Sequence, residues 1–143
     1  MTKPVLHLLD ANALIALTNA SHIHHGRVAD WFDTIDRWAT TPITEAAFVR
    51  LMLNPLVAGA QLTRANVVEA LAAIRDADRH EFLPDQSSLA DPRIDLSGLL
   101  SFRQVADMHL VNLAAGHGAV LATLDKRIRA ALKASEQRWV HLI

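Results

Sequence analysis

Four acidic residues stand where an apolar run of the sequence gives way to a predicted helix, or where such a helix opens. They are Asp10, Glu45, Asp107 and Asp125. If the strands before these helices form a parallel sheet, their carboxyl ends meet at one edge and the acids converge there. Crowded carboxylates repel one another unless a divalent cation lies among them. The four acids therefore predict metal-dependent phosphoryl chemistry.

The available ligands indicate which metal this would be. The sequence has no cysteine, so any metal site in it must use oxygen or imidazole donors. Hard carboxylate oxygens favour Mg²⁺, with Mn²⁺ as a substitute, over zinc. Such ions activate a water molecule and stabilise the attacking and leaving oxygens of a phosphodiester.

Each acid also has a purely structural explanation. Asp10, Asp107 and Asp125 suit the N-cap of a helix, where a carboxylate accepts backbone N–H bonds. Glu45 lies in the first turn of a predicted helix, where the helix dipole favours a negative charge. Asp10 and Asp125, however, each follow a predicted strand, which is where ligands of open α/β sheets bind. This favours a shared site over four separate caps.

The elements that must position these acids alternate along the chain. Apolar runs predict strands over 5–9, 37–40, 80–83, 119–124 and 139–142. Helical spacing predicts helices over 11–17, 28–35, 44–53, 63–75, 107–116 and 126–132, and the segment 84–101 is expected to be loop with a short helical piece. Strands that alternate with helices indicate a three-layer α/β/α fold with a central parallel sheet. We expect one domain over residues 1–143.

Composition excludes several classes of protein. The chain has 143 residues, of which 51% are hydrophobic, enough for one domain with a real core. It lacks an apolar run near the roughly 20 residues that span a bilayer, so we expect no membrane insertion. Met1 to Pro4 lead directly into a strand pattern without a secretory h-region, which together with the absence of cysteine predicts a cytoplasmic protein.

Net charge does not decide the partner. Lys and Arg total 14 against 15 Asp and Glu, a formal charge of −1. Setting the four site acids aside leaves −1 + 4 = +3 on the rest of the chain, so a modestly cationic surface around an acidic pocket is compatible with the sequence.

Four segments together resemble the successive motifs of PIN domains. They are Leu8-Leu9-Asp10-Ala11-Asn12-Ala13-Leu14, Thr44-Glu45-Ala46-Ala47-Phe48-Val49-Arg50, Ala106-Asp107-Met108-His109-Leu110 and Leu121-Ala122-Thr123-Leu124-Asp125. Their order and spacing are most similar to VapC-type toxins of bacterial type II toxin–antitoxin systems, and the likeness covers nearly the whole chain. Lys126-Arg127 and Met108-His109 depart from the pairs common in such proteins, which affects the expected substrate preference rather than the expected activity.

The resemblance implies a Mg²⁺-dependent endoribonuclease with about five parallel strands. Asp10 and Asp107 would be the principal metal ligands, while Glu45 and Asp125 complete the acidic pocket. Asn12 and Thr123 match polar positions that support such pockets. The resemblance also implies an RNA substrate, a cognate antitoxin and a homodimer.

Several further residues have candidate roles. Arg50, Lys126 and Arg127 are placed to bind RNA phosphates. His22 and His24 invite a metal site, but their spacing in an expected loop favours none. The resemblance places His25 near the start of the second helix, in a packing or capping role. Three aromatic residues are expected to be core or dimer contacts rather than stacking platforms for bases, and the helical spacing in this region favours the core; they are Trp31, Phe32 and Trp38.

Two other classes of protein stay open. One is a non-catalytic PIN-like interaction module, which would leave RNA intact with and without Mg²⁺. The other is an acidic-pocket phosphotransfer protein, such as a receiver domain or a haloacid dehalogenase relative, although residues 10–14 lack the second Asp of the dehalogenase pattern. The sequence has neither a glycine-rich phosphate loop nor a Gly-x-Ser-x-Gly motif, which excludes P-loop NTPases and α/β-hydrolases.

Overall fold

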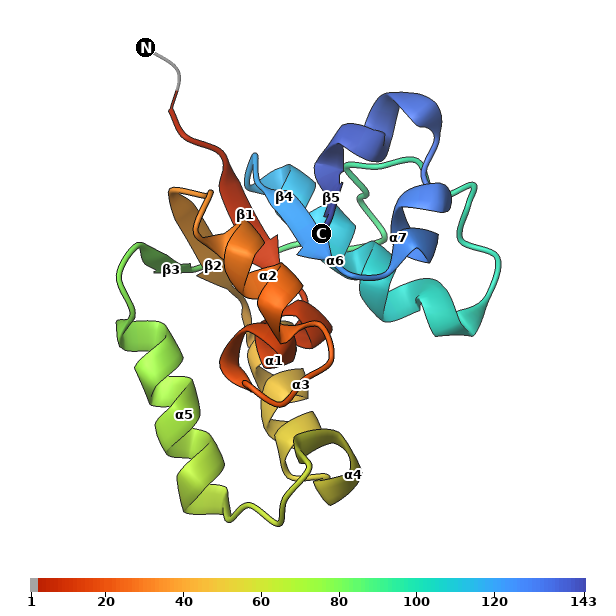
Figure 1. Cartoon of the computed structure of the whole chain (residues 1–143). Helices are drawn as coiled ribbons and strands as arrows, with labels where there is room; N and C mark the ends of the chain where they lie inside the picture. Colours follow the sequence, from red (N-terminus) through yellow and green to blue (C-terminus); the bar gives the residue numbers. More distant parts are fainter. Residues whose placement is uncertain (1–2) are drawn as a thin grey trace.

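A five-stranded parallel sheet forms the centre of the molecule, as predicted (Figure 1). The computed structural model describes residues 3–143, so that Met1 and Thr2 of the expected leader-free start lie outside the described residues. The strands follow the spatial order β3-β2-β1-β4-β5. Their bounds are β1 (Leu6–Leu9), β2 (Arg37–Thr40), β3 (His80–Phe82), β4 (Val120–Thr123) and β5 (Val140–Leu142).

The order of the strands creates the place where a site can form. β1 is central and pairs with β2 through Leu8 and Ala39, and with β4 through Leu8 and Leu121. From β1 the chain builds the sheet first towards β3 and then, after α6, towards β5. Such a reversal of order opens a crevice outside the carboxyl ends of the two strands where it occurs, here β1 and β4.

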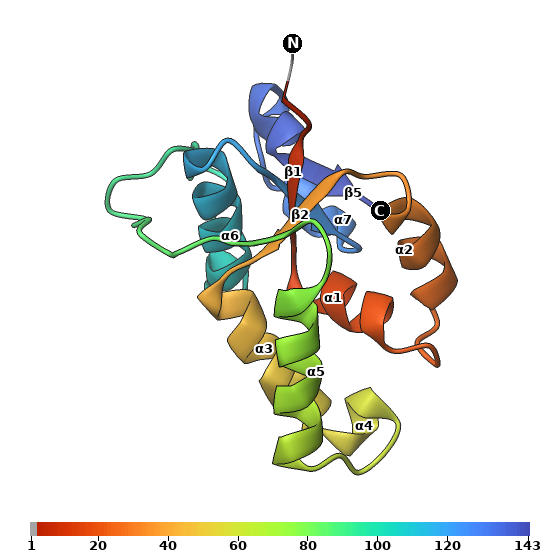
Figure 2. The same ribbon diagram turned by 90° about the vertical axis from the view of Figure 1, so that its left-hand side faces the viewer.

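Helices cover both faces of the sheet. Figure 2 shows α6 on one side and α1 and α2 on the other. Among residues 3–143, no helix combines the length and apolar character of a membrane-spanning segment. The helices are α1 (Ala11–Thr18), α2 (His25–Phe32), α3 (Pro42–Met52), α4 (Pro55–Ala58), α5 (Arg64–Asp76), α6 (Val105–Gly116) and α7 (Lys126–Ala130), with two 3₁₀ turns, η1 (Phe102–Gln104) and η2 (Ala134–Trp139).

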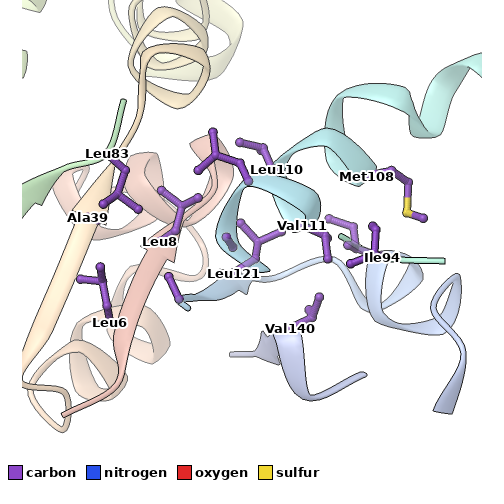
Figure 3. Close-up of a cluster of buried hydrophobic side chains, with 14 of the residues drawn as sticks. Leu6, Leu8, Ala39, Leu83, Ile94, Met108, Leu110, Val111, Leu121 and Val140 are labelled. Atoms are coloured by element: carbon purple, nitrogen blue, oxygen red, sulfur yellow. The ribbon is translucent and has the colours of Figure 1, made fainter. Parts of the chain in front are cut away.

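Alternating strand residues feed two separate hydrophobic cores. Leu8 points to the face covered by α6, where it joins a cluster with Val111 and Leu121 (Figure 3). The next residue, Leu9, points to the opposite face and packs with Trp38 and other side chains from α1, α3 and α5. Trp38 is only 2% exposed, and Trp31 and Phe32 pack against the same cluster, which confirms the predicted core role of these aromatics.

The structure corrects several predicted boundaries. α3 begins at Pro42 rather than at residue 44, because proline is well tolerated in the first helical turn and the Thr41 N–H is satisfied by the Thr44 hydroxyl at 3.1 Å. The second helix ends at Phe32, so Ile35 is buried in a turn. The helical piece expected within 84–101 is absent from the described chain.

The segment 84–101 forms a long loop, and Asn112 holds it in place through hydrogen bonds to its backbone. This fully buried residue of α6 accepts a bond from the Arg93 backbone N–H at 2.6 Å and donates to the Ser88 carbonyl at 3.3 Å. Buried backbone groups of a loop need such partners. One α6 side chain therefore holds two separate points of the loop.

His7 is expected to make the fold sensitive to acid. It lies on β1 between Trp31 and His141, at ring-centroid distances of 5.4 and 5.8 Å, and its Nδ1 is buried without a hydrogen-bond partner. Burial, followed by the His141 charge, lowers the pKa of His7 below 6.5. The unfolded chain therefore binds the extra proton first, and the stabilising contribution of neutral His7 is lost as pH falls below 6.5.

We expect the variant His7→Phe to lose less stability than the parent chain between pH 7.5 and pH 5.5, because a phenyl ring keeps the aromatic contacts and cannot be protonated. Urea unfolding of the metal-free proteins at both pH values measures this difference. Equal losses for the two chains would show that His7 does not carry the acid sensitivity.

Candidate active site

Three of the four predicted acids converge at the crevice between β1 and β4. Asp10 and Asp107 line one cavity of about 180 Å³, and Asp107 and Asp125 line a neighbouring one of about 270 Å³. Asp10 follows β1, Asp125 follows β4, and Asp107 lies in the first turn of α6. The topology thus brings together carboxylates that are distant in the sequence.

Asp10 is held firmly by two hydrogen bonds. Its Oδ1 accepts the Ala13 backbone N–H at 2.8 Å, which makes Asp10 the N-cap of α1, and its Oδ2 accepts the Thr123 hydroxyl at 2.5 Å. Asp10 is 6% exposed. The structure confirms the predicted role of Asp10 as the N-cap of α1. This capping bond also holds the carboxylate at the cavity, so the two roles are compatible.

The electrostatics of the site disfavour negative charge. Burial raises the pKa of Asp10 to about 6, although hydrogen bonds from Thr123 and Ala13 lower it, and the charges of Asp107 and Asp125 add to the rise. The pKa of Asp107 is also raised, first by burial and then by the charge of Asp125. A cation between Asp10 and Asp107 would relieve both effects.

Arg127 pairs with Asp125 and stabilises the ionised form of its carboxylate. The Arg127 guanidinium forms a two-point contact with both carboxylate oxygens at 3.0 and 2.8 Å, and the Arg127 backbone N–H also donates to Oδ1 at 2.9 Å. The hydrogen bond from Arg127 is the main cause of the lowered pKa of Asp125. Asp125 also caps α7.

Glu45 is not brought into this group. Its Oε2 accepts the Thr40 hydroxyl at 2.7 Å, and its Oε1 lies 3.7 Å from the Arg75 guanidinium of α5. The Thr40 hydroxyl also contacts His80 Nε2 at 2.8 Å. The Glu45 carboxylate therefore faces β3 and α5, while its neighbour Thr44 lines the cavity of Asp10 and Asp107.

The two supporting polar residues lie at the site. The Thr123 hydroxyl donates to Asp10 Oδ2 and accepts the Asp125 backbone N–H at 3.0 Å, so it links the ends of β1 and β4. Asn12 lines the cavity of Asp10 and Asp107 and also a larger neighbouring cavity.

The residues present fit a magnesium-like ion. Among residues 3–143, no group of three or more histidine or acidic side chains is placed so that it could hold a metal ion. Mg²⁺ needs no such group, since it is usually bound by one or two carboxylates and keeps several waters. Asp10 and Asp107 line the same cavity, and both have pKa values raised by burial, so they provide two hard donors whose charge a cation would stabilise.

The predicted phosphate-binding residues surround the acids. Arg50 lines the cavity of Asp10 and Asp107, Arg127 lines that of Asp107 and Asp125, and Lys126 lines the larger cavity beside it. Arg27 lines this larger cavity with Lys126 but was not among the sequence candidates. No local pattern marks Arg27, because its proximity to Lys126 arises only from tertiary structure.

The structure explains the unusual Met108-His109 pair. Met108 is 1% exposed in the core, while His109 Nε2 lies 2.6 Å from Asp85 Oδ2 in the long loop. Although burial raises it, hydrogen bonds from His109 and Ser87 lower the pKa of Asp85 overall. His109 thus attaches the loop to α6 and does not point to the acids.

His25 begins α2, and its Nδ1 lies 2.8 Å from the Ala16 carbonyl of α1, a packing role as the resemblance implied.

Comparisons with known proteins agree with this architecture. The family model named PIN domain matches residues 7–133, which include all four predicted acids. Ribonuclease VapC38 of Mycobacterium tuberculosis is 44% identical over 120 residues, covering 82% of this chain and 84% of the relative. Ribonuclease VapC29 of the same species is 40% identical over 119 residues, with coverage of 82% and 84%.

Solved structures share the fold at low sequence identity. PAE2754 from Pyrobaculum aerophilum has a TM-score of 0.59 at 22% identity and covers 90% of this chain and 81% of its own. Mycobacterium tuberculosis VapC20, described as a toxin that cleaves the sarcin-ricin loop, has a TM-score of 0.59 at 14% identity, with coverage of 87% and 94%. With its parallel sheet, its match to the family model and its relatives at 40–44% identity, the chain belongs to the PIN domain family and groups with VapC-type proteins.

Proposed function

We propose that this protein is a metal-dependent endoribonuclease that acts as the toxin of a toxin–antitoxin pair. The observation that carries the proposal is the convergence of Asp10, Asp107 and Asp125 at the β1–β4 crevice, where burial raises the pKa of the first two. The names of its relatives, ribonucleases VapC38 and VapC29, support RNA as the substrate.

Asp10 and Asp107 are the proposed ligands of Mg²⁺, and Mn²⁺ would be a substitute. When bound, the ion supplies Lewis-acid chemistry: it lowers the pKa of a bound water and neutralises charge on the phosphate. Asp125, close to Asp107 but paired with Arg127, would orient water at the edge of the site. Hydrolysis by water needs no nucleophilic side chain.

The remaining residues hold these acids and the substrate. Thr123 fixes Asp10 Oδ2 by its short hydrogen bond, so that the carboxylate keeps one orientation. Asn12 lines the cavity beside it and can hydrogen-bond water or a ribose hydroxyl. The proposed phosphate contacts are Arg50, Lys126 and Arg127, which surround the acids on different elements.

Glu45 stays in the proposal as a carboxylate that can turn towards the cavity. It lies in the first turn of α3, next to Thr44 of the cavity wall, and its partner Arg75 is partly exposed at 3.7 Å. To turn, the carboxylate would have to exchange this ion pair and its buried hydrogen bond from Thr40 for a metal or a water ligand.

A nuclease of this kind would damage the cell that makes it. We therefore include in the proposal a cognate antitoxin that covers the acids. The resemblance to VapC-type toxins adds two further parts of the proposal, a cytoplasmic location with its RNA substrate and a homodimer.

Removal of the metal tests the proposal. We expect the purified protein to cut single-stranded and structured RNA internally with Mg²⁺ or Mn²⁺, and to leave it intact in EDTA. Gel analysis of 5′-labelled RNA distinguishes internal cuts from trimming, and the Asp107→Asn variant controls for contaminating nucleases. RNA that stays intact under every metal condition would support the non-catalytic interaction module instead, and labelling by acetyl phosphate would support the phosphotransfer alternative.

A further inference from the structure

The largest of the three cavities lies beside Asp125, and most of its charged side chains are basic. It has a volume of about 600 Å³ and opens between the start of α2, the start of α7 and the end of β5. Its polar wall carries His22, His24, Arg27, Lys126 and Arg127. Its apolar wall consists of Leu124, Leu142 and Ile143, and Leu142 is 39% exposed. A cavity of this size matches a ligand of roughly nucleotide size.

The side chains that line the cavity carry more positive than negative charge. Asp125 is the one acidic side chain that lines it within the described residues, and Arg127 already holds both oxygens of that carboxylate. Arg27 and Lys126 therefore face the cavity without a carboxylate side-chain partner in its lining. Two cations on separate helices attract an anion that lies between them.

His22 adds an oriented hydrogen-bond donor. His22 Nδ1 accepts the His24 backbone N–H at 3.0 Å, so the proton of the neutral His22 ring must be on Nε2. Burial, followed by the charges of His24 and His25, lowers the pKa of His22, and the ring is therefore neutral at pH 7.5. The two rings lie 5.7 Å apart on the wall that also carries Arg27.

The cavity adjoins the proposed catalytic centre. Asn12 lines both this cavity and the one of Asp10 and Asp107. Asp125 and Arg127 line both this cavity and the one of Asp107 and Asp125. The nucleotide next to a phosphate at the acids would therefore have the cationic cavity as its neighbour.

We infer that this cavity binds a nucleotide of the RNA strand next to the cleaved phosphate. Arg27 and Lys126 bind its phosphate, His22 donates to the phosphate or ribose, and the Leu124–Leu142 wall packs against the sugar or base. The inference rests on the proposed function, which it extends by locating the path of the RNA. It adds Arg27 and His22 to the substrate contacts.

Binding without cleavage tests the inference separately from the proposed function. Fluorescence anisotropy with a labelled single-stranded RNA oligonucleotide in EDTA measures affinity as salt is varied. We expect Arg27→Ala to weaken binding about 5- to 10-fold at 100 mM salt and to reduce the slope of log K against log salt by about 0.7, the value for one lost phosphate contact. Arg64→Ala is the matched control, because this exposed arginine of α5 lines none of the cavities described above. Equal effects of the two variants would overturn the inference.

A second measurement follows the cavity itself. Titration of ¹⁵N-labelled protein with adenosine 5′-monophosphate should shift the His22 ring and Leu142 backbone signals, whereas inorganic phosphate at equal concentration should shift His22 alone. Unchanged signals with both ligands would contradict a nucleotide site. A polyglutamate peptide that binds through Arg27 while RNA binding is unaffected by Arg27→Ala would instead assign the cavity to an acidic protein partner.

The outcomes separate the two proposals. RNA binding that depends on Arg27 in a protein that never cleaves would sustain the cavity and reject the nuclease. Metal-dependent cleavage with RNA binding indifferent to Arg27→Ala would reject the cavity alone. Thermal unfolding of both arginine variants checks that a loss of affinity is not a loss of fold.

Discussion

Asp10→Asn should abolish RNA cleavage and, at the same time, make the metal-free protein more stable. The activity loss is expected on the order of 1000-fold, because the variant removes one of two proposed carboxylate ligands and with it the charge that holds the ion. The gain in stability follows from the buried position of Asp10, whose pKa is raised to about 6. Asparagine keeps the side-chain oxygen that caps Ala13 but carries no charge.

The sign and pH range of the stability effect follow from linkage. A carboxyl with a folded pKa of about 6 and an unfolded pKa near 3.8 stabilises the fold fully below pH 3.8, and this contribution is lost as pH rises through about 6. At pH 7.5 the charged group costs up to about 3 kcal/mol, and the variant removes that cost. Urea unfolding in EDTA at pH 7.5 measures the difference.

Magnesium provides the control for this prediction. Saturating Mg²⁺ should stabilise the parent chain by mass action and leave the stability of Asp10→Asn nearly unchanged. The stability advantage of the variant should therefore shrink or disappear when Mg²⁺ is added. A variant that is less stable than the parent chain in EDTA at pH 7.5 would show that capping of α1 outweighs the burial of charge.

Gly98→Ala should have the largest effect on the fold of any single methyl group added at a glycine. A Cβ built at Gly98 would lie 1.8 Å from the backbone carbonyl oxygen of Ala131, at the end of α7. Backbone cannot rotate away as a side chain does, so either the loop or α7 must move. Overpacking of this kind costs about 2–3 kcal/mol.

The same movement should reach the site, because α7 begins directly after Asp125. We therefore expect reduced RNA cleavage together with a lower free energy of unfolding. Gly26→Ala is the matched control: it lies in α2 with no atom within 4 Å of the added methyl, and alanine favours helix, so stability should be unchanged or slightly raised. Identical unfolding curves for Gly98→Ala and the parent chain would show that the close approach to Ala131 is easily relieved.

The parallel sheet could be predicted from sequence because its signals are local. Short apolar runs, such as 5–9 and 119–124, marked β1 and β4 to within one residue at each end. Helix starts were also well marked where a cap or proline stands, as at Thr63 before α5. The missed elements, α4, η1 and η2, are short and take their shape from neighbouring contacts more than from a periodic pattern.

The site was predictable in part for the same reason. Asp10 and Asp125 follow strands whose ends are adjacent in the sheet, so topology alone brings them near each other. Side-chain direction is a different matter. Glu45 lies on the expected helix, yet it faces Arg75 and Thr40, and α5, which supplies Arg75, is placed only by the tertiary fold.

The role of Arg27 could not be predicted from the sequence either. It is 99 positions before Lys126, and nothing in the pattern of α2 distinguishes it from a solvent-exposed arginine. Only the packing of α2 against α1 brings it to the cavity beside Asp125. Charged side chains of this kind acquire a role from their neighbours in space.

The pairing of β1 with β4 determines when the proposed centre can form during synthesis. The Thr123–Asp10 hydrogen bond joins residues 113 positions apart, so the proposed catalytic centre depends on a long-range contact. A ribosome adds about 5–20 residues per second, and the segment between these two residues therefore takes roughly ten seconds to emerge. Throughout that interval the nascent chain has Asp10 but lacks β4, so a chain that has not yet emerged as far as Thr123 cannot assemble the proposed centre.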